Sequence, residues 1–378
     1  MFGDLLKLLP RTVVHKAAIK HGSNRWRKSF NLWDHVVAMV GVHLAGRTSL
    51  REAELLFSHA RSRHFHLNCR SVKRSTLADA NKTRDSAAFA DIVKQLIAAG
   101  GRRERQTGAM LSILDASPIQ LDGRGHAWAQ ASRYMNRSQG LKLHLLMTPD
   151  DGNLEYAAIT DMNVNDITEA HNVPLEAGRI YLFDKGYCDY NWWCDIIAAG
   201  SHFVTRIKIN AAWRIIEERP VIAPDIVSDH IIELTNKAPR AGKINHLAGR
   251  PLRLVEINHP AGKGTPFLIV SDLLDVPAEE IAAFYKRRWD IELLFKWIKQ
   301  NLKIKRFLGE SRNAIVIQIL TAIIAYLLLR AYRNLLGKKI APRLKDLVVR
   351  CQIGLLQPLH INPATPTRGL LDQAELSF

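Results

Sequence analysis

The chain has 378 residues, 47% of them hydrophobic and 24% charged, so it is long enough for two or three domains and its composition argues against wholesale disorder. Its 53 lysines and arginines against 36 acidic residues give a net charge of +17, which favours a polyanionic partner, nucleic acid first, without by itself establishing an enzyme. The four cysteines have no paired spacing and fit a reducing cytosol.

The amino-terminal region, residues 1–105, is predicted to be helical. Apolar residues at helical spacing predict a helix over 31–45, a Ser-x-x-Glu pattern at Ser49 predicts the start of a second helix, and a third helix is predicted over 86–99. Residues 1–100 contain 17 lysines and arginines but only 7 acidic residues. The net charge of this segment is therefore +10, in about a quarter of the chain.

A basic connector follows the second of these helices, with histidine and phenylalanine among its cations. It comprises Arg61, Arg63, His64, Phe65, His66, Arg70, Lys73 and Arg74. A run of charges is usually a solvated face of a protein. Because the chain has a large positive net charge and a candidate catalytic set follows this run, we expect the run to bind DNA.

Residues 106–206 are predicted to form a mixed sheet flanked by helices, the first part of a catalytic core. The predicted elements are strands over 110–115, 141–147, 154–159, 180–183 and 202–207, and a helix over 190–199. Two strands end in a carboxylate, Asp115 and Asp184, where open α/β folds place their chemistry. A single aspartate there is more often a turn residue or a helix cap, so each needs support from elsewhere in the chain.

Residues 207–272 are predicted to be a β-rich insertion, because they contain two strand-like runs, 252–257 and 267–271, between turn-rich segments. Residues 273–335 would return to the catalytic core through a helix that begins near Pro277.

The carboxyl-terminal residues 336–378 are expected to form a tail. Before them, the apolar segment 314–329 has about 16 residues, short of the roughly 20 that span a bilayer, so we expect a buried core helix. Since the amino end also lacks the pattern of a signal peptide, no association with a membrane is expected.

The segment 285–299 carries one carboxylate among cations and a phenol. At about 100° per residue, five of its side chains fall within a helical stripe roughly 80° wide: Tyr285, Arg288, Glu292, Lys296 and Lys299. Taken alone, the stripe fits an amphipathic surface helix with ordinary ion pairs equally well. Together with Asp115 and Asp184, it completes a candidate set of three carboxylates.

Three carboxylates beside cations suit phosphoryl transfer on nucleic acid. Mg²⁺ prefers oxygen ligands, and two such ions about 3.5–4 Å apart can activate an attacking oxygen and stabilise a leaving one. Arg288 and Lys299 would neutralise neighbouring phosphates, with Lys296 on the same stripe. Lys185 and Arg206 are further candidate phosphate contacts by position alone.

Three segments also carry a resemblance to a known family. They are Leu114-Asp115-Ala116-Ser117, Phe183-Asp184-Lys185-Gly186-Tyr187 and Tyr285-x2-Arg288-x3-Glu292-x6-Lys299. In these segments the chain resembles a DDE transposase of the insertion-sequence-four family. The last segment matches the Tyr-Arg-Glu-Lys signature of that family at its full spacing. The resemblance covers about residues 1–335. It implies an RNase H-like catalytic core with Asp115, Asp184 and Glu292 as metal ligands.

The resemblance further implies cut-and-paste transposition of a bacterial insertion sequence, by two-metal-ion cleavage and strand transfer at the element ends. The expected cofactor is a pair of Mg²⁺ ions, with Mn²⁺ as a substitute. Double-stranded DNA would be the partner, as terminal inverted repeats and as target, and joining two ends calls for a homodimer on DNA. The expected location is the bacterial cytoplasm, in association with the nucleoid. Relatives that cut through a DNA hairpin use a tryptophan in the inserted β region, where this chain has only Trp213, so the hairpin route stays open.

Two other classes of function compete with this interpretation. A catalytically inactive, sequence-specific DNA-binding protein derived from such an element would show the same basic charge. A phosphatase of the haloacid-dehalogenase type would need a second aspartate where Ser117 lies, and a two-carboxylate glycosidase would not explain the basic stripe around Glu292.

Overall fold

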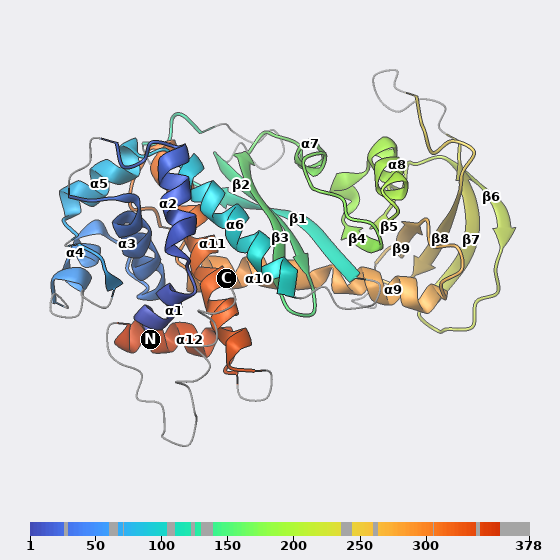
Figure 1. The fold of residues 1–378 in the computed structure, drawn as a ribbon. Helices are drawn as coiled ribbons and strands as arrows, with labels where there is room; N and C mark the ends of the chain where they lie inside the picture. The colour runs from blue at the N-terminus through green and yellow to red at the C-terminus, as the bar shows by residue number, and fades with distance from the viewer. Residues whose placement is uncertain are drawn as a thin grey trace. The chain divides into compact units, whose positions relative to one another are not determined.

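The chain forms two compact units, each of which is described by itself (Figure 1). The computed structural model describes residues 1–25, 29–59, 67–70, 72–103, 110–121, 125–129, 139–235, 244–259, 264–304, 306–337 and 341–355. The helical unit comprises Met1–Arg103, Ile119–Gln130 and Lys296–Phe378, and the sheet unit comprises Glu104–Pro118 and Ala131–Phe295. This division follows internal contacts; the functional boundaries at 105, 206, 272 and 335 stay predictions.

The helical unit confirms that the described part of residues 1–105 is helical. Its helices are α1 (Phe2–Lys7), α2 (Arg11–Lys20), α3 (Leu32–Leu44), α4 (Leu50–His59), α5 (Arg74–Thr83), α6 (Ala87–Arg103), α11 (Arg312–Leu335) and α12 (Leu344–Gly354). A reciprocal capping box begins α3, where Asp34 N donates to Asn31 Oδ1 and Asn31 N donates to Asp34 Oδ2, both at 2.9 Å. At α4 the predicted Ser49 cap accepts from Glu52 N at 3.2 Å. Residues 61–66 of the basic connector lie outside the described residues.

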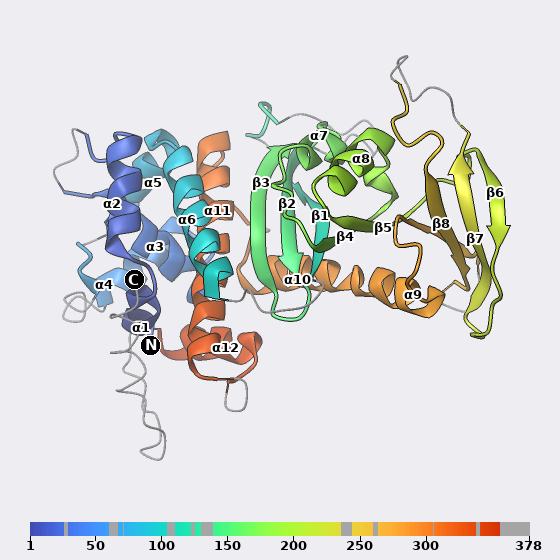
Figure 2. The same ribbon diagram turned by 45° about the vertical axis from the view of Figure 1, so that its right-hand side comes forward.

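The apolar segment predicted to be a buried helix is α11, which contacts α1, α3, α5, α6 and α12 (Figure 2). Within the described ranges it is the one helix long and apolar enough to cross a membrane, and 94% of its most apolar window is buried inside the protein. Its polar side chains are paired locally: Gln318 Oε1 accepts from Leu308 N and Gln318 Nε2 donates to Arg306 O, both at 2.8 Å. These contacts are those of a core helix.

The sheet unit is built on a nine-stranded mixed sheet of order β3-β2-β1-β4-β5-β9-β8-β7-β6. The strands are β1 (Met110–Gln120), β2 (Gly140–Thr148), β3 (Asn153–Asp161), β4 (Arg179–Phe183), β5 (His202–Arg206), β6 (Trp213–Glu218), β7 (Ile226–Leu234), β8 (Pro251–Ile257) and β9 (Phe267–Ser271). β4 is parallel to both β1 and β5, whereas the pairs from β5 through β9 to β6 are antiparallel. The predicted mixed sheet is confirmed.

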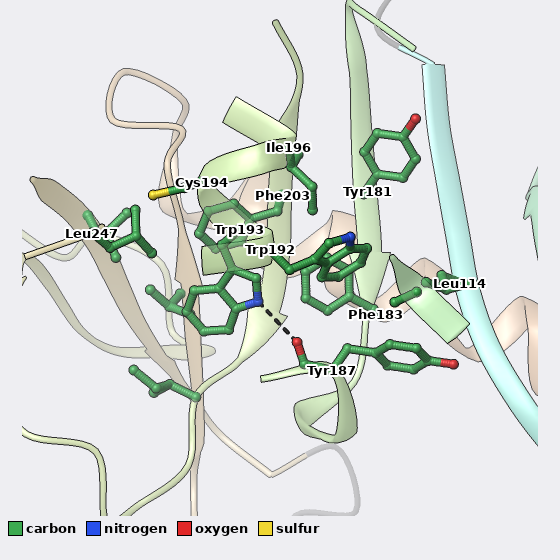
Figure 3. Packing of buried hydrophobic residues seen from close by; sticks show 14 of the residues in the cluster. Leu114, Tyr181, Phe183, Tyr187, Trp192, Trp193, Cys194, Ile196, Phe203 and Leu247 are labelled. Carbon is green, nitrogen blue, oxygen red and sulfur yellow. Dashed lines mark hydrogen bonds between the residues drawn. The ribbon is translucent and has the colours of Figure 1, made fainter. Parts of the chain in front are cut away.

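Two helices lie on opposite faces of this sheet at β5, α8 (Tyr190–Ala198) and α9 (Ala278–Arg287) (Figures 1 and 2). The short helix α7 (Asp166–Ala170) contacts the 3₁₀ turn η2 (Lys185–Tyr187). An aromatic core lies beneath α8, in which Phe183 packs against Trp192 at 4.9 Å between ring centroids and Trp193 packs against Phe203 at 4.9 Å (Figure 3). This core holds the end of β4, the strand that leads into Asp184.

Three predictions about the sheet unit need correction. β1 does not end at Asp115 but continues to Gln120, because the backbone stays extended after the apolar run stops and Ile119 is again buried. Strands β6 and β7 escaped prediction; the outer strand β6 is mostly exposed and carries charged residues, which hides its alternation. The strands of the insertion also continue the main sheet, through the pairing of β9 with β5.

A further correction concerns the segment 285–299, which is not one helix. α9 ends at Arg287 and α10 (Trp289–Asn301) begins two residues later, with Arg288 between them. Arg288 keeps helical angles, but its N–H donates to Tyr285 O, three residues back, at 3.0 Å. Arg288 therefore lies in a tight turn between the two helices.

Candidate active site

Asp184 follows β4 directly and caps the turn η2. Its Oδ1 accepts from Gly186 N at 2.5 Å. A Cβ atom at Gly186 would lie 2.8 Å from that oxygen, so glycine is what lets the carboxylate fold back onto the turn. The backbone of the turn therefore fixes one oxygen of Asp184.

Asp115 lies on the neighbouring strand β1, at the level of Asp184. The parallel register pairs Ile113 with Leu182, and the same register two residues further brings Asp115 opposite Asp184. Neighbouring strands lie about 4.8 Å apart, and paired residues point to the same face of a sheet. Asp115 Oδ1 accepts from Ala116 N at 2.8 Å.

Glu292 reaches this pair through Arg288. The Arg288 guanidinium lies between two carboxylates, with Nη2 2.6 Å from Glu292 Oε1 and Nη1 3.6 Å from Asp115 Oδ2. The side chains of Arg288 and Asp115 are 13% and 18% exposed, whereas that of Glu292 is 35% exposed. Arg288 Nε is buried and lacks a hydrogen-bond partner among the described residues.

The electrostatics of Asp115 reflect this crowding of carboxylates. Burial, which disfavours the charged form, raises the pKa of Asp115 to about 7, and the neighbouring charges of Asp184 and Glu292 add to that increase. The Ala116 N–H and the Arg288 guanidinium act in the opposite direction. A further cation at this position would favour the ionised carboxylate.

The donor set fits a hard divalent cation, because the three side chains offer only carboxylate oxygens and share an excess of negative charge. Within the described ranges, no three or more histidine, cysteine, aspartate or glutamate side chains lie close enough together to hold a metal ion without rearrangement. The guanidinium of Arg288 brings positive charge to two of these carboxylates, those of Asp115 and Glu292.

Tyr285 and Arg206, two of the predicted DNA contacts, gather on the same side of the sheet unit. Arg206 lies over the ring of Phe267 at 3.8 Å, and that ring meets Tyr285 edge-on at 6.5 Å between centroids. Burial raises the pKa of Tyr285, while the charges of Arg288 and Arg206 oppose that shift. The phenol is therefore close to both guanidinium groups.

The three lysines predicted to contact DNA come from two elements, η2 and α10. Lys185 is exposed on η2, and Lys296 and Lys299 lie on the later part of α10, among the residues that belong to the helical unit. The roles of all three stay predictions.

Sequence reasoning missed one residue of the cluster, Tyr187, although it quoted the Asp-x-Gly-Tyr segment. Its ring lies in the aromatic core, 6.1 Å from the Phe183 ring between centroids, while its hydroxyl lies among acidic side chains. The signal that could have found it is the spacing, since a 3₁₀ turn brings the third residue after Asp184 back toward the strand.

Comparison with known proteins places these observations in a family. A family model described as a transposase DDE domain matches residues 106–328, and a second model, a domain of unknown function, matches residues 1–67. The chain is 39% identical over 302 residues to y4zB of Sinorhizobium fredii, a transposase by name, covering 76% of this chain and 81% of that one. It is 28% identical over 281 residues to a protein of Synechocystis named as a transposase for the insertion sequence element IS4SA, covering 71% and 75% of the two chains.

A solved structure supports the fold. The piggyBac transposase, in a synaptic complex with hairpin DNA, aligns with a TM-score of 0.53 at 11% identity, over 98% of this chain and 84% of that chain. The likeness confirms the predicted RNase H-like fold.

Proposed function

The chain belongs to the DDE transposases, and its assignment to the insertion-sequence-four family fits the matched domain; from this membership we propose that it moves a bacterial insertion sequence by cut-and-paste transposition. One observation supports the proposal most: the Arg288 guanidinium lies between Asp115 and Glu292, which are more than a hundred residues apart in the chain, and the charges of Asp184 and Glu292 both act on Asp115. The reaction would be cleavage of the DNA strand at the element end, followed by transfer of that end to target DNA.

We infer that the three carboxylates hold two Mg²⁺ ions, or Mn²⁺ in their place. Asp115 and Asp184 would hold one ion, and Asp115 and Glu292 would hold the other. When bound, the ions would supply the positive charge that activates the attacking oxygen and stabilises the leaving one. The protein's part is orientation: Gly186 N–H and Ala116 N–H each hold one carboxylate oxygen, so that the remaining oxygens face the site.

The cations around the cluster would bind the DNA backbone. Arg288 presents a planar fork suited to a phosphate, and Arg206 and Tyr285 lie beside it. Lys185, Lys296 and Lys299 would add charge along the strand, and the basic amino-terminal helices would hold the inverted repeats. Two copies of the chain would act on two ends in the bacterial cytoplasm, at the nucleoid.

The test is strand cleavage of a duplex that carries the element ends, with Mg²⁺, by purified full-length protein. Asp115→Asn, Asp184→Asn and Glu292→Gln should each reduce cleavage by about 10³-fold or more, because each removes a charge that the reaction centre uses. DNA binding should change by less than about threefold, since phosphate contacts supply most of the affinity.

Asp195→Asn is the matched control, because Asp195 is an exposed acid on α8. Cleavage by all three site variants at the control's rate would refute the proposal. Binding of the ends without cleavage by the parent protein would instead favour the inactive DNA-binding protein.

A further inference from the structure

Tyr187 carries a hydroxyl that the proposed chemistry does not yet use. The residue is 1% exposed, and its hydroxyl has no hydrogen-bond partner within the part of the chain that the structure describes. The rest of the residue is well held: Trp193 Nε1 donates to Tyr187 O at 3.1 Å, and the ring packs 6.2 Å from that of Trp192 between centroids. Figure 3 shows the phenol extending toward the side of Leu114, with its hydroxyl directed away from the Trp193 indole.

The surroundings of this hydroxyl are acidic. Burial raises the pKa of Tyr187 well above its ordinary value, and the charges of Asp115, Asp166, Asp184 and Glu169 add to the shift. An ordinary phenol, with a pKa of about 10, is already protonated at neutral pH, so this hydroxyl is protonated there as well. It is a hydrogen-bond donor surrounded by acceptors.

Two of the four acceptors are already engaged. Asp166 Oδ1 accepts from Lys142 Nζ at 2.6 Å, and Glu169 Oε1 accepts from the Tyr156 hydroxyl at 2.5 Å. These contacts also fix the α7 side of the cluster, and the Lys142 ion pair agrees with a structural role for Asp166.

The two catalytic carboxylates are less fully engaged. Asp115 Oδ2 has the Arg288 guanidinium at 3.6 Å, which is longer than a hydrogen bond. Asp184 accepts from Gly186 N through Oδ1, and its Oδ2 has no donor among the residues that the structure describes. The phenol extends toward Leu114, the residue before Asp115, and Asp184 caps the turn that ends at Tyr187, so the Asp115–Asp184 pair is the candidate acceptor for the Tyr187 hydroxyl (Figure 3).

We propose that Tyr187 is a positioning residue for the metal-binding carboxylates, whose hydroxyl donates to the Asp115–Asp184 pair when a divalent cation is bound. The inference rests on the proposed function, because it needs these carboxylates to be metal ligands. A bound cation turns ligand oxygens toward itself, and hydrogen bonds to the other oxygens then hold the carboxylates in orientation. Among the described residues the same hydroxyl is buried and has no hydrogen-bond partner.

This arrangement gives Tyr187→Phe opposite effects in the two states. Without metal, the substitution removes an unpaired polar group and keeps the ring, so thermal stability should be unchanged or higher. With metal, it removes a hydrogen bond to a ligand, so affinity should fall. A residue that serves only packing would show neither the loss of affinity nor its dependence on metal.

The experiment uses the full-length protein without DNA and measures Mn²⁺ affinity by titration calorimetry and by the spin resonance of unbound Mn²⁺. Tyr187→Phe should weaken Mn²⁺ binding about tenfold or more, a size typical for partners of metal ligands. Its melting temperature in EDTA should equal or exceed that of the parent. The cleavage defect should be largest at limiting Mn²⁺ and should be relieved at saturating Mn²⁺.

Tyr190→Phe is the matched control, because Tyr190 packs on Trp193 in the same aromatic core, at 5.2 Å between centroids, and the acids of the site do not affect its phenol. Mn²⁺ affinity of Tyr187→Phe within twofold of the parent would overturn the inference, and so would a lower melting temperature in EDTA. If the parent binds Mn²⁺ equally well after Asp115→Asn and Asp184→Asn, the proposed metal site itself fails. If Asp115→Asn and Asp184→Asn lose Mn²⁺ binding while Tyr187→Phe keeps it, the proposed metal site stands and only the role of Tyr187 is overturned.

Discussion

The two sides of the carboxylate cluster are held in different ways. On the β4 side, Asp184 follows a strand locked by the aromatic core, and the backbone of its own turn donates to its carboxylate. On the α10 side, Glu292 lies on a half-exposed helix start and is held by the charge of one side chain, Arg288. One acid is oriented by a backbone hydrogen bond and by packing of its strand, and the other by an ion pair that a bound cation or a phosphate could replace.

This difference teaches where the site is rigid and where it is adaptable. Trp193 is fully buried behind Asp184, whereas Trp289 and Leu293, next to Glu292, are 56% and 53% exposed. The rigid side can serve as the reference for the chemistry, and the adaptable side can respond to metal and DNA.

The largest expected effect tests the core behind Asp184. Trp193→Ala should lower the free energy of unfolding by about 3–5 kcal/mol, because it removes a fully buried indole. Leu293→Ala, on the exposed side, should change it by less than about 0.5 kcal/mol. Urea denaturation followed by fluorescence and circular dichroism measures both, and equal losses would erase the contrast.

A smaller effect tests the turn. Gly186→Ala places a Cβ atom 2.8 Å from Asp184 Oδ1, so the carboxylate must move. Cleavage should fall by about 100-fold, the cost of a misplaced catalytic group, while the free energy of unfolding changes by less than about 1 kcal/mol. Cleavage at the parental rate would show that the position of Asp184 is not set by this turn.

The smallest effect tests the α10 side of the cluster, where Glu292 is held by Arg288. Arg288→Met removes the guanidinium that occupies the space between Asp115 and Glu292, so Mn²⁺ binding without DNA should tighten by about tenfold even though cleavage falls. Arg287→Met is the control, because Arg287 pairs with Asp150 and Asp290 instead. Weaker Mn²⁺ binding in Arg288→Met than in the control would mean that Arg288 supports the metal rather than competing with it.

Much of this arrangement could be predicted from residue types and spacing. Apolar runs that end in Asp115 and Asp184 indicated two strands, and the spacing from Tyr285 to Lys299 indicated the helical segment that brings Glu292. The mixed sheet, the helical amino-terminal region and the family are confirmed.

The rest depends on geometry that a one-dimensional pattern does not contain. The end of β1 was misplaced because backbone extension depends on pairing and on the burial of Ile119 rather than on the apolar run. The break at Arg288 was missed because the regular spacing of polar residues continues through it, while the backbone hydrogen bond there changes to a residue three positions back. The hydroxyl of Tyr187 was missed because its surroundings come from four acids on three elements.

The most direct test of the account is anomalous diffraction from crystals of the full-length protein soaked in Mn²⁺. We predict anomalous peaks among the carboxylates of Asp115, Asp184 and Glu292, with Arg288 displaced from its place between Asp115 and Glu292. Peaks elsewhere in the molecule, or a cluster still closed around Arg288 with no ion at saturating Mn²⁺, would contradict it.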